Sequence, residues 1–157
     1  MKGPYHDSLT LLVVLTALYL AGCDEGKTFA AGALRHLSVS DPLQAPIVSS
    51  GSIPVLVELV CSGNPDGRTE AANAIFNLSM LDDDNRVAVN KAGGIEALVD
   101  LLRSGNAEEM TAAASALRAL CLNNDNQTAV GKAGAVEPLM ELLRTGEADG
   151  KIAAAGA

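Results

Sequence analysis

The chain has 157 residues and a formal net charge of −8, from 11 Lys and Arg against 19 Asp and Glu. Binding to nucleic acid needs clustered Lys and Arg that neutralise phosphates and release counterions, and the basic residues here are scattered, so no nucleic-acid partner is expected. Hydrophobic residues make up 48% of the sequence and aromatic residues only 3%, with no Trp, so a core must be built from Leu, Val, Ile and Ala.

An apolar stretch at residues 9–21 runs into Leu20-Ala21-Gly22-Cys23, which looks like the cleavage box of a bacterial lipoprotein. The stretch is short for a spanning helix, which needs about 20 apolar residues, and suits the core of a signal peptide. Residues 12–22 also align with residues 53–63 in a repeat, and a signal peptide has no reason to follow that register. The register favours a repeat helix and makes a membrane location unexpected; a chain anchored through Cys23 is the alternative.

The chain repeats one helical pattern four times, and the last copy is cut short. Aligned on Thr28, Thr69, Thr111 and Ile152, the copies are spaced by 41, 42 and 41 residues. A period of about 40–47 residues built from helices is typical of a helical solenoid. Such a protein stacks its units into one continuous core and presents a long surface to another macromolecule. The period therefore indicates binding rather than catalysis.

Residues 82–122 form the clearest unit. Asp82 to Asp84 supply acceptors and negative charge at the start of a short helix, and Gly93 and Gly94 permit the left-handed turn that ends it. The next helix, residues 95–103, carries one apolar stripe, made by Ile95, Leu98, Val99 and Leu102. A third helix is predicted from about Ala107 to Leu122, with Ala113, Leu117 and Leu120 facing the core.

This three-helix unit resembles the armadillo repeat. The resemblance rests on the second helices and the glycine turns before them, at residues 50–60, 92–102 and 133–143, and on the third-helix segment at residues 71–79. It implies an all-α, right-handed α-solenoid with three helices in each unit. The Asn-rich link at residues 122–126 and the Asn77-Leu78-Ser79 ending look like the armadillo arrays of plant U-box ubiquitin ligases and related adaptors. That looser likeness implies a cytoplasmic or nuclear scaffold that recruits substrates for ubiquitination.

The whole chain, residues 1–157, is expected to form one armadillo domain. Residues 1–40 make a partial repeat without its first helix, residues 41–81 and 82–122 make two full repeats, and residues 123–157 make a truncated one. Solenoids normally end in units with a polar outer face, which neither end of this sequence carries. We therefore expect a fragment whose apolar end faces are candidate surfaces for self-association.

In armadillo proteins the third helices line a concave groove, where an Asn commonly bonds the backbone of an extended peptide. The positions that match this Asn are His36, Asn77 and Ala119, and those that match a neighbouring Trp of importin-type members are Gly32, Asn73 and Ser115. Because no Trp can hold Lys side chains by cation–π contact, binding of nuclear-localisation signals is not expected. The expected partner is a peptide or helix of another protein.

Seven residues are the candidate partner-binding site of this groove: Arg35, His36, Asn73, Phe76, Asn77, Ser115 and Arg118. Asn73 and Asn77 would bond the backbone of the partner. Phe76 would anchor an apolar side chain, and Arg35 and Arg118 would favour acidic side chains, since aromatic and Arg residues dominate binding hot spots. Three alternatives stay open: Asn77 bonds the backbone of the next link, His36 is a solvated or satisfied polar residue without a role, and Phe76 packs at a repeat junction.

No catalytic, metal or cofactor site is expected, and the chain is interpreted as a non-enzyme. Cys23, Cys61 and Cys121 lack the spacing of metal ligands, and Cys121 is interpreted as a small buried thiol. The segment Gly26-Lys27-Thr28 carries only the end of the phosphate-binding loop pattern, whose first glycine is missing. Glu58, Asp100 and Glu141 recur at one repeat position, which indicates a solvated helix face rather than a catalytic pair.

Overall fold

The computed structural model describes residues 22–157, in which every regular element is an α-helix. The repeat helix expected at residues 12–22 lies outside this described part, except for Gly22. The cleavage-box residues Leu20 and Ala21 also lie outside it. The described helices are α2 (Asp24–Leu37), α3 (Asp41–Ser49), α4 (Ser52–Ser62), α5 (Pro65–Leu81), α6 (Asp83–Lys91), α7 (Gly94–Ser104), α8 (Ala107–Leu120), α9 (Asn124–Lys132), α10 (Val136–Thr145) and α11 (Ala148–Gly156).

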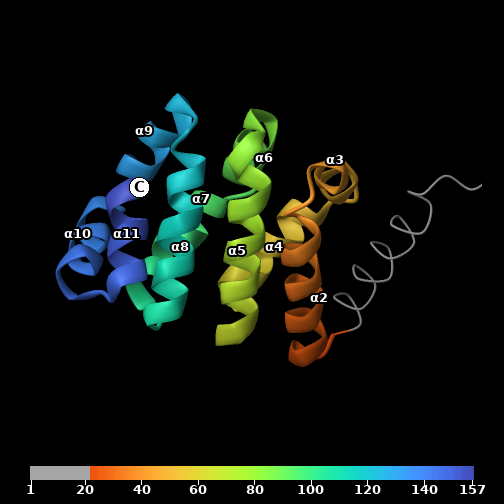
Figure 1. Cartoon of the computed structure of the whole chain (residues 1–157), viewed down its shortest axis with the longest axis horizontal. Helices are drawn as coiled ribbons and strands as arrows, with labels where there is room; N and C mark the ends of the chain where they lie inside the picture. Colours follow the sequence, from red (N-terminus) through yellow and green to blue (C-terminus); the bar gives the residue numbers. More distant parts are fainter. Residues whose placement is uncertain (1–21) are drawn as a thin grey trace, which may run out of the picture.

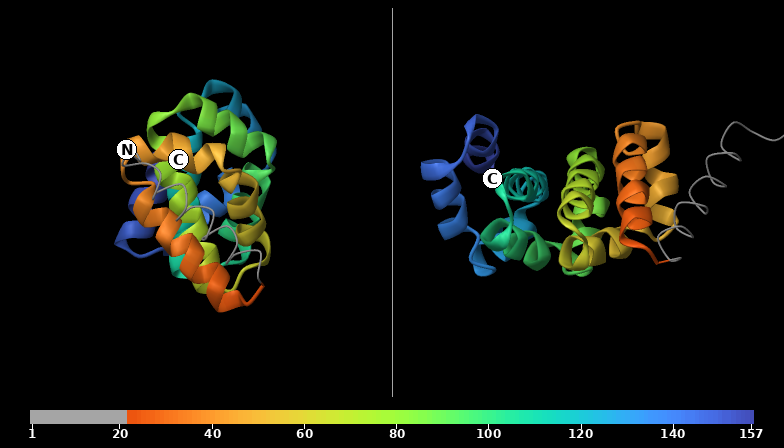
Figure 2. Two further views of the ribbon diagram at one scale, coloured as in Figure 1. Left: turned by 90° about the vertical axis from the view of Figure 1, so that its right-hand side faces the viewer. Right: turned by 90° about the horizontal axis from the view of Figure 1, so that it is seen from below.

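The helices stack as three-helix units along one axis. The third helices of successive units, α2, α5, α8 and α11, run side by side across the molecule (Figure 1), and α5 packs against both α2 and α8. The second helices α4, α7 and α10 form a layer on the other side of the stack (Figure 2), and the short first helices α3, α6 and α9 lie along one edge. This arrangement is the all-α solenoid that the period predicts.

Local sequence signals begin and end the helices of the unit at residues 82–122. The side chain of Asp82 accepts hydrogen bonds from the backbone N–H groups of Asp84 and Asn85, at 2.8 and 3.3 Å, and begins α6. Gly93 has a φ of +80°, a left-handed conformation that glycine adopts without steric cost, and separates α6 from α7. The predicted cap and the predicted turn are both confirmed.

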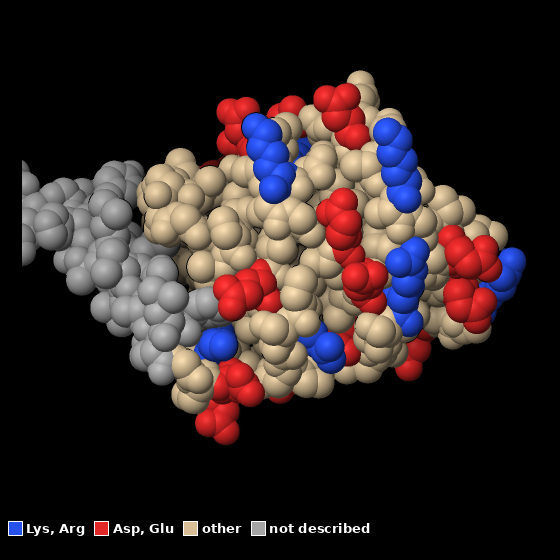
Figure 3. Space-filling model, turned by 180° about the vertical axis from the view of Figure 1, so that it is seen from behind, with Lys and Arg blue, Asp and Glu red and all other residues tan. Residues whose placement is uncertain are grey.

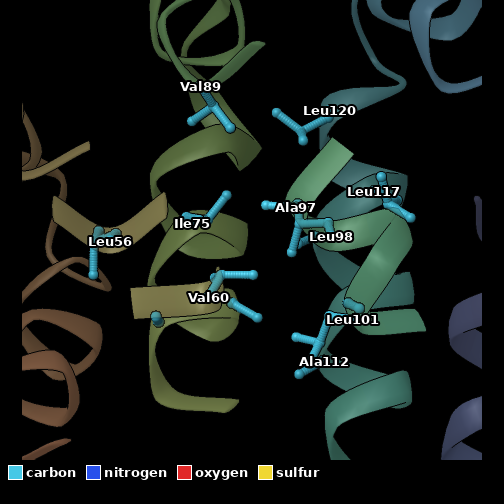
Figure 4. Packing of buried hydrophobic residues seen from close by; sticks show 14 of the residues in the cluster. Leu56, Val60, Ile75, Val89, Ala97, Leu98, Leu101, Ala112, Leu117 and Leu120 are labelled. Carbon is cyan, nitrogen blue, oxygen red and sulfur yellow. The ribbon is translucent and has the colours of Figure 1, made fainter. Parts of the chain in front are cut away.

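One hydrophobic core runs through successive units. The predicted stripe of α7 is buried, with Ile95, Leu98 and Leu102 0% exposed and Val99 1% exposed. Large side chains from α4 to α8 converge on the same interior (Figure 4). Alanines at the centres of α5 and α8 are also fully buried, namely Ala71, Ala72, Ala113 and Ala114. Small residues at these positions let neighbouring third helices approach closely, as dense interior packing requires.

Polar side chains join each unit to the next. Arg68 in α5 forms an ion pair with Glu109 in α8, where Nη2 lies 2.7 Å from Oε1 and the Glu109 side chain is 2% exposed. Asn126 in α9 donates a 3.1 Å hydrogen bond to the backbone oxygen of Arg86 in α6. The amide of Asn123 donates to both carboxylate oxygens of Asp83 at 3.0 Å, and with the Arg86 guanidinium it lowers the pKa of that carboxyl.

The end of the third helix in this unit differs from the prediction. α8 stops at Leu120 rather than Leu122, because the chain turns through Cys121 to reach the cap of α9 at Asn123. Cys121 is therefore half-buried instead of buried, and desolvation raises the pKa of its thiol.

The surface behind the third helices is charged and mixed in sign. Basic and acidic side chains are interspersed across it (Figure 3). Glu58, Asp100 and Glu141, on the second helices α4, α7 and α10, are exposed, as the recurrence of carboxylates predicts. Within residues 22–157 no single helix is long and apolar enough to cross a membrane; α3 and α4 reach the length and composition only as a pair, which bends by 83° between them.

Candidate binding groove

Two adjoining hollows cross the third helices, and we call this surface the third-helix groove. The smaller hollow, of about 410 Å³, lies over α2 and α5 and includes Phe29 and His36 in its lining. The larger hollow, of about 560 Å³, extends over α5, α8 and α11 and includes Asn73. Thr69 and Glu108 line both hollows, so the two form one groove across four helices.

Carboxylates dominate the charge of the groove. Among residues 22–157, its lining includes no Lys or Arg and five acidic residues: Asp66, Glu70, Glu108, Glu147 and Asp149. Most of them lie near the N-terminal ends of third helices, where negative charge also complements the helix dipole. Their position in the sequence indicates only helix starts; their convergence on one groove depends on the stacking of the units. The lining therefore carries an excess of carboxylates, of which Glu70 is paired with Arg35, and the sequence pattern did not predict this excess.

Phe29 is a further groove residue that the sequence pattern did not predict. Its ring is 78% exposed, on α2, and lines the smaller hollow. The corresponding position in α5 is Glu70, so no repeated aromatic signal marks this position along the chain. An exposed aromatic ring in a hollow is a suitable anchor for a partner, because such rings are enriched at interfaces.

Arg35 and His36 lie together at the end of α2, and Arg35 already has an ionic partner. Its Nε forms an ion pair with Oε2 of Glu70 in α5, and its Nη2 lies 3.1 Å from Nε2 of His36. The charge of Arg35 is thus matched within the protein. His36 is exposed and lines the smaller hollow, where its ring can reach a partner.

The amide of Asn77 bridges two units. It donates to the backbone oxygen of Arg35 at 3.0 Å and to the hydroxyl oxygen of Ser38 at 3.2 Å. Both amide hydrogens are used in holding α5 to the end of α2, which leaves the side-chain oxygen as the group that can accept from a partner. Asn77 therefore has a structural role, as one of the open alternatives proposes, but its hydrogen bonds go to the preceding unit and not to the next link.

Asn73 and Ser115 occupy equivalent positions in α5 and α8 but differ in availability. Asn73 is half-buried and lines the larger hollow beside Thr69 and Met110. The hydroxyl of Ser115 donates a 2.9 Å hydrogen bond to the backbone oxygen of Thr111, one turn earlier in the same helix. Asn73 is therefore the better-placed amide for contact with the backbone of a partner.

Phe76 and Arg118 form a pair across α5 and α8. The guanidinium carbon of Arg118 lies 5.8 Å from the centre of the Phe76 ring, within the range of a cation–π contact, and both side chains are half-buried. Phe76 also packs against the hydrophobic core. The pair lies towards the C-terminal ends of the third helices, on the same side as Arg35 and away from the acidic hollows.

Metal-ligating residues do not gather in the described part of the chain. Within residues 22–157 no three His, Cys, Asp or Glu side chains lie close enough together to hold a metal ion. The geometry of the groove, with amide, aromatic and carboxylate groups on a broad helical surface, is suited to contact with a polypeptide.

Comparison with known proteins identifies the repeat. The model of the armadillo/β-catenin-like repeat matches residues 40–80, 82–122 and 123–157, which together make up most of the chain. No curated protein sequence matches the chain. Solved structures match it throughout most of its length.

Two engineered proteins of known crystal structure share the fold with a TM-score of 0.87. One is 31% identical over 92% of this chain and 60% of its own, and the other is 33% identical over 93% of this chain and 36% of its own. A designed armadillo repeat protein in complex with the peptide (KR)4 has a TM-score of 0.86, at 22% identity over 96% of this chain and 66% of its own. This chain thus spans less than two thirds of the length of each of these proteins, and it belongs to the family of armadillo/β-catenin-like repeat proteins.

Proposed function

We propose that the chain is a protein-interaction scaffold that binds a peptide or helix of a partner protein in the third-helix groove. The observation that carries this proposal is the pair of adjoining hollows, which together span α2, α5, α8 and α11. Structural relatives support it: one is described as complexed with the peptide (KR)4, and others as designed for modular peptide recognition.

The contacts expected in the groove follow from the groups that its surface offers. Asn73 would bond the backbone of the partner, and Phe29 would anchor an apolar side chain. The carboxylates of Glu108 and Asp149 would favour basic side chains in the hollows, since complementary charge raises association rates and specificity. Arg118, beside Phe76 and outside the two hollows, would favour an acidic or aromatic group of the partner towards the C-terminal ends of the third helices.

A finer role is part of the same proposal. The chain would act as an adaptor in the cytoplasm or nucleus, including substrate recruitment for ubiquitination, on the strength of the likeness of residues 122–126 to plant U-box ligases. Co-expression with a ubiquitin-ligase module and a protein that binds the groove would test this role. The role predicts that the partner is ubiquitinated with the wild-type chain and less so with the Phe29→Ala, Asn73→Ala variant.

Peptide binding provides the test of the groove. Peptides are selected from a random display library on the full chain, and the affinity of the best one is then measured by fluorescence anisotropy for a Phe29→Ala, Asn73→Ala variant. Asn77 is kept in the variant because its amide holds two units together. Circular dichroism confirms that the variant keeps its helices.

The proposal predicts a loss of at least about tenfold in affinity, or about 1.4 kcal/mol. Val39→Ala is the matched control, because Val39 is apolar, 69% exposed and outside both hollows. Equal affinities for the groove variant and the wild type, or an equal loss in the control, would place the binding surface elsewhere.

A further inference from the structure

An apolar patch lies at the edge of the solenoid where third helices end and first helices begin. Val39, in the turn after α2, is 69% exposed, and Met80 and Leu81, at the end of α5, are 37% and 66% exposed. Val39 and Met80 occupy equivalent positions of adjacent units, and the ends of α2 and α5 lie at the same edge as the starts of α3 and α6 (Figure 1). We call these three side chains the edge patch.

The backbone beside the edge patch is held in place by side chains of the first helices. The guanidinium of Arg86 in α6 donates to the backbone oxygens of Ser79 and Met80, at 2.7 and 2.8 Å. The amide of Gln44 in α3 donates a 2.9 Å hydrogen bond to the backbone oxygen of Ser38, next to Val39. A partner therefore meets a surface that is already ordered, which lowers the entropic cost of binding.

Carboxylates follow both parts of the edge patch in the sequence. Four exposed acidic residues lie within three positions of Val39 or Leu81, namely Asp41, Asp82, Asp83 and Asp84. Arg86 is the one basic residue within residues 39–46 and 80–86, and its side chain is 12% exposed and forms an ion pair with Asp83. The edge patch is thus an apolar surface beside an excess of carboxylates.

The basic side chains one turn nearer the groove already have partners within the chain. Arg35, four residues before Val39, forms an ion pair with Glu70. Arg118 lies over the ring of Phe76, which is four residues before Met80. These cations therefore do not cancel the excess of carboxylates at the edge.

We infer that the edge patch binds a basic, amphipathic α-helix of a partner protein, at a surface separate from the groove. The helices α2 and α5 pack together, and the axes of packed helices are about 8–10 Å apart. Two residues seven positions apart on a helix share one face and are about 10 Å apart along its axis. One aliphatic side chain of the partner can therefore contact Val39 while the next contacts Met80 and Leu81.

Charge selects the kind of helix. Lys or Arg side chains beside the two aliphatic residues would pair with the carboxylates of the edge, and complementary charge favours such a partner over neutral or acidic ones. A second copy of the chain is a poor occupant, because the net charge of −8 makes two copies repel each other.

A designed helical peptide tests this inference on the full chain. The probe is about four turns long. It carries Leu at two positions seven residues apart, Lys next to each Leu on the same helical face, and Ala elsewhere. A hydrocarbon staple on the opposite face keeps it helical, and its binding is measured by fluorescence anisotropy. One control peptide has Ser in place of both Leu residues, and a second has Glu in place of each Lys.

The inference predicts saturable binding of the probe, and binding of each control peptide that is weaker by at least about tenfold. In the protein, the Val39→Ser, Leu81→Ser variant should also lose at least about tenfold in affinity for the probe. Its fold should persist because both side chains are largely exposed. The Phe29→Ala, Asn73→Ala variant should bind the probe like the wild type, because both changes lie in the groove.

A second variant tests the charge. Asp41→Asn, Asp84→Asn should lose at least about threefold in affinity for the probe. Asp82 and Asp83 are kept because they cap α6 and pair with Arg86. The matched control is Glu58→Gln, Asp100→Asn, which removes the same charge from exposed positions on the second helices and should leave the affinity within about twofold of the wild type.

Four results would contradict the inference: no saturable binding, equal binding of the probe and the Ser peptide, full affinity in the Val39→Ser, Leu81→Ser variant, or equal losses in the two charge variants. Tighter binding of the Glu peptide would overturn the choice of a basic partner. Loss of binding in the Phe29→Ala, Asn73→Ala variant would assign the probe to the groove instead. A dimer in sedimentation analysis that the probe dissociates would make a second copy the occupant.

Discussion

The unit at residues 82–122 and the last unit share one sequence pattern but differ in how their apolar residues are buried. Ile95 and Val99 of α7 are 0% and 1% exposed, whereas the corresponding Val136 and Met140 of α10 are 64% and 42% exposed. Within residues 22–157, α7 packs against helices of the preceding, the same and the following unit, whereas α10 packs chiefly against α7 and α11. In a solenoid, the pattern within a unit determines which residues are apolar, and the neighbouring helices determine which of them are buried.

The starts of the third helices show the same contrast. Asn106 caps α8 in a reciprocal box, in which its side chain accepts from the backbone of Glu109 and its backbone donates to the Glu109 carboxylate. Glu147, at the same place before α11, makes no side-chain cap. The inner unit is thus stabilised at its helix start as well as in its core.

The largest expected difference is in core truncation. Leu98→Ala should lower the free energy of unfolding by about 2–5 kcal/mol, because Leu98 is 0% exposed and its removal leaves a cavity. Met140→Ala at the exposed end should cost less than about 1 kcal/mol, because much of its side chain already contacts water. Urea unfolding followed by circular dichroism measures both values, and similar losses would show that the last unit is covered in solution.

The next effect concerns the ion pair that joins α5 to α8. Glu109→Ala should destabilise the protein by about 3 kcal/mol, because it removes a buried carboxylate (side chain 2% exposed) that pairs with Arg68 and accepts a hydrogen bond from the backbone N–H of Asn106. Glu108→Ala, at the exposed neighbouring position, should change stability by less than about 0.5 kcal/mol. A double-mutant cycle with Arg68→Ala isolates the pair, and a coupling energy near zero would remove it as a link between units.

The smallest effects are at the helix starts. Asn106→Ala should cost about 1 kcal/mol through loss of the cap, and Glu147→Asn should add up to about 1 kcal/mol by supplying one to α11. Thermal unfolding compares the two variants, with the midpoint falling for the first and rising for the second. A Glu147→Asn variant that melts at the wild-type temperature would mean that the start of α11 is open before global unfolding.

Much of the fold could be predicted because its determinants are local and repeated. The Asp82 cap, the turn at Gly93 and the stripe of α7 each depend on residues within a few positions of one another, and the period shows that they recur. The predicted end of α8 lies two residues beyond the observed one, since Leu122 continues the apolar run although the chain has already turned.

The contacts between units could not be predicted in the same way. The bonds from Asn77 to the end of α2, and the ion pair between Arg35 and Glu70, join residues 35 to 42 positions apart. Their partners depend on how far one third helix is displaced and rotated relative to the next, which the periodic pattern leaves open. For the same reason, the acidic residues of the groove could be recognised in the sequence only as helix starts.

Chemical-shift mapping of the full chain with a selected peptide tests the central claim most directly. Binding in the third-helix groove predicts the largest shifts at Phe29, His36, Thr69 and Asn73, with smaller ones at Phe76 and Arg118 and none at Glu58 or Asp100 on the opposite surface. Shifts concentrated at Glu58 and Asp100, with the residues of the groove unmoved, would contradict the assignment of the third helices as the binding surface.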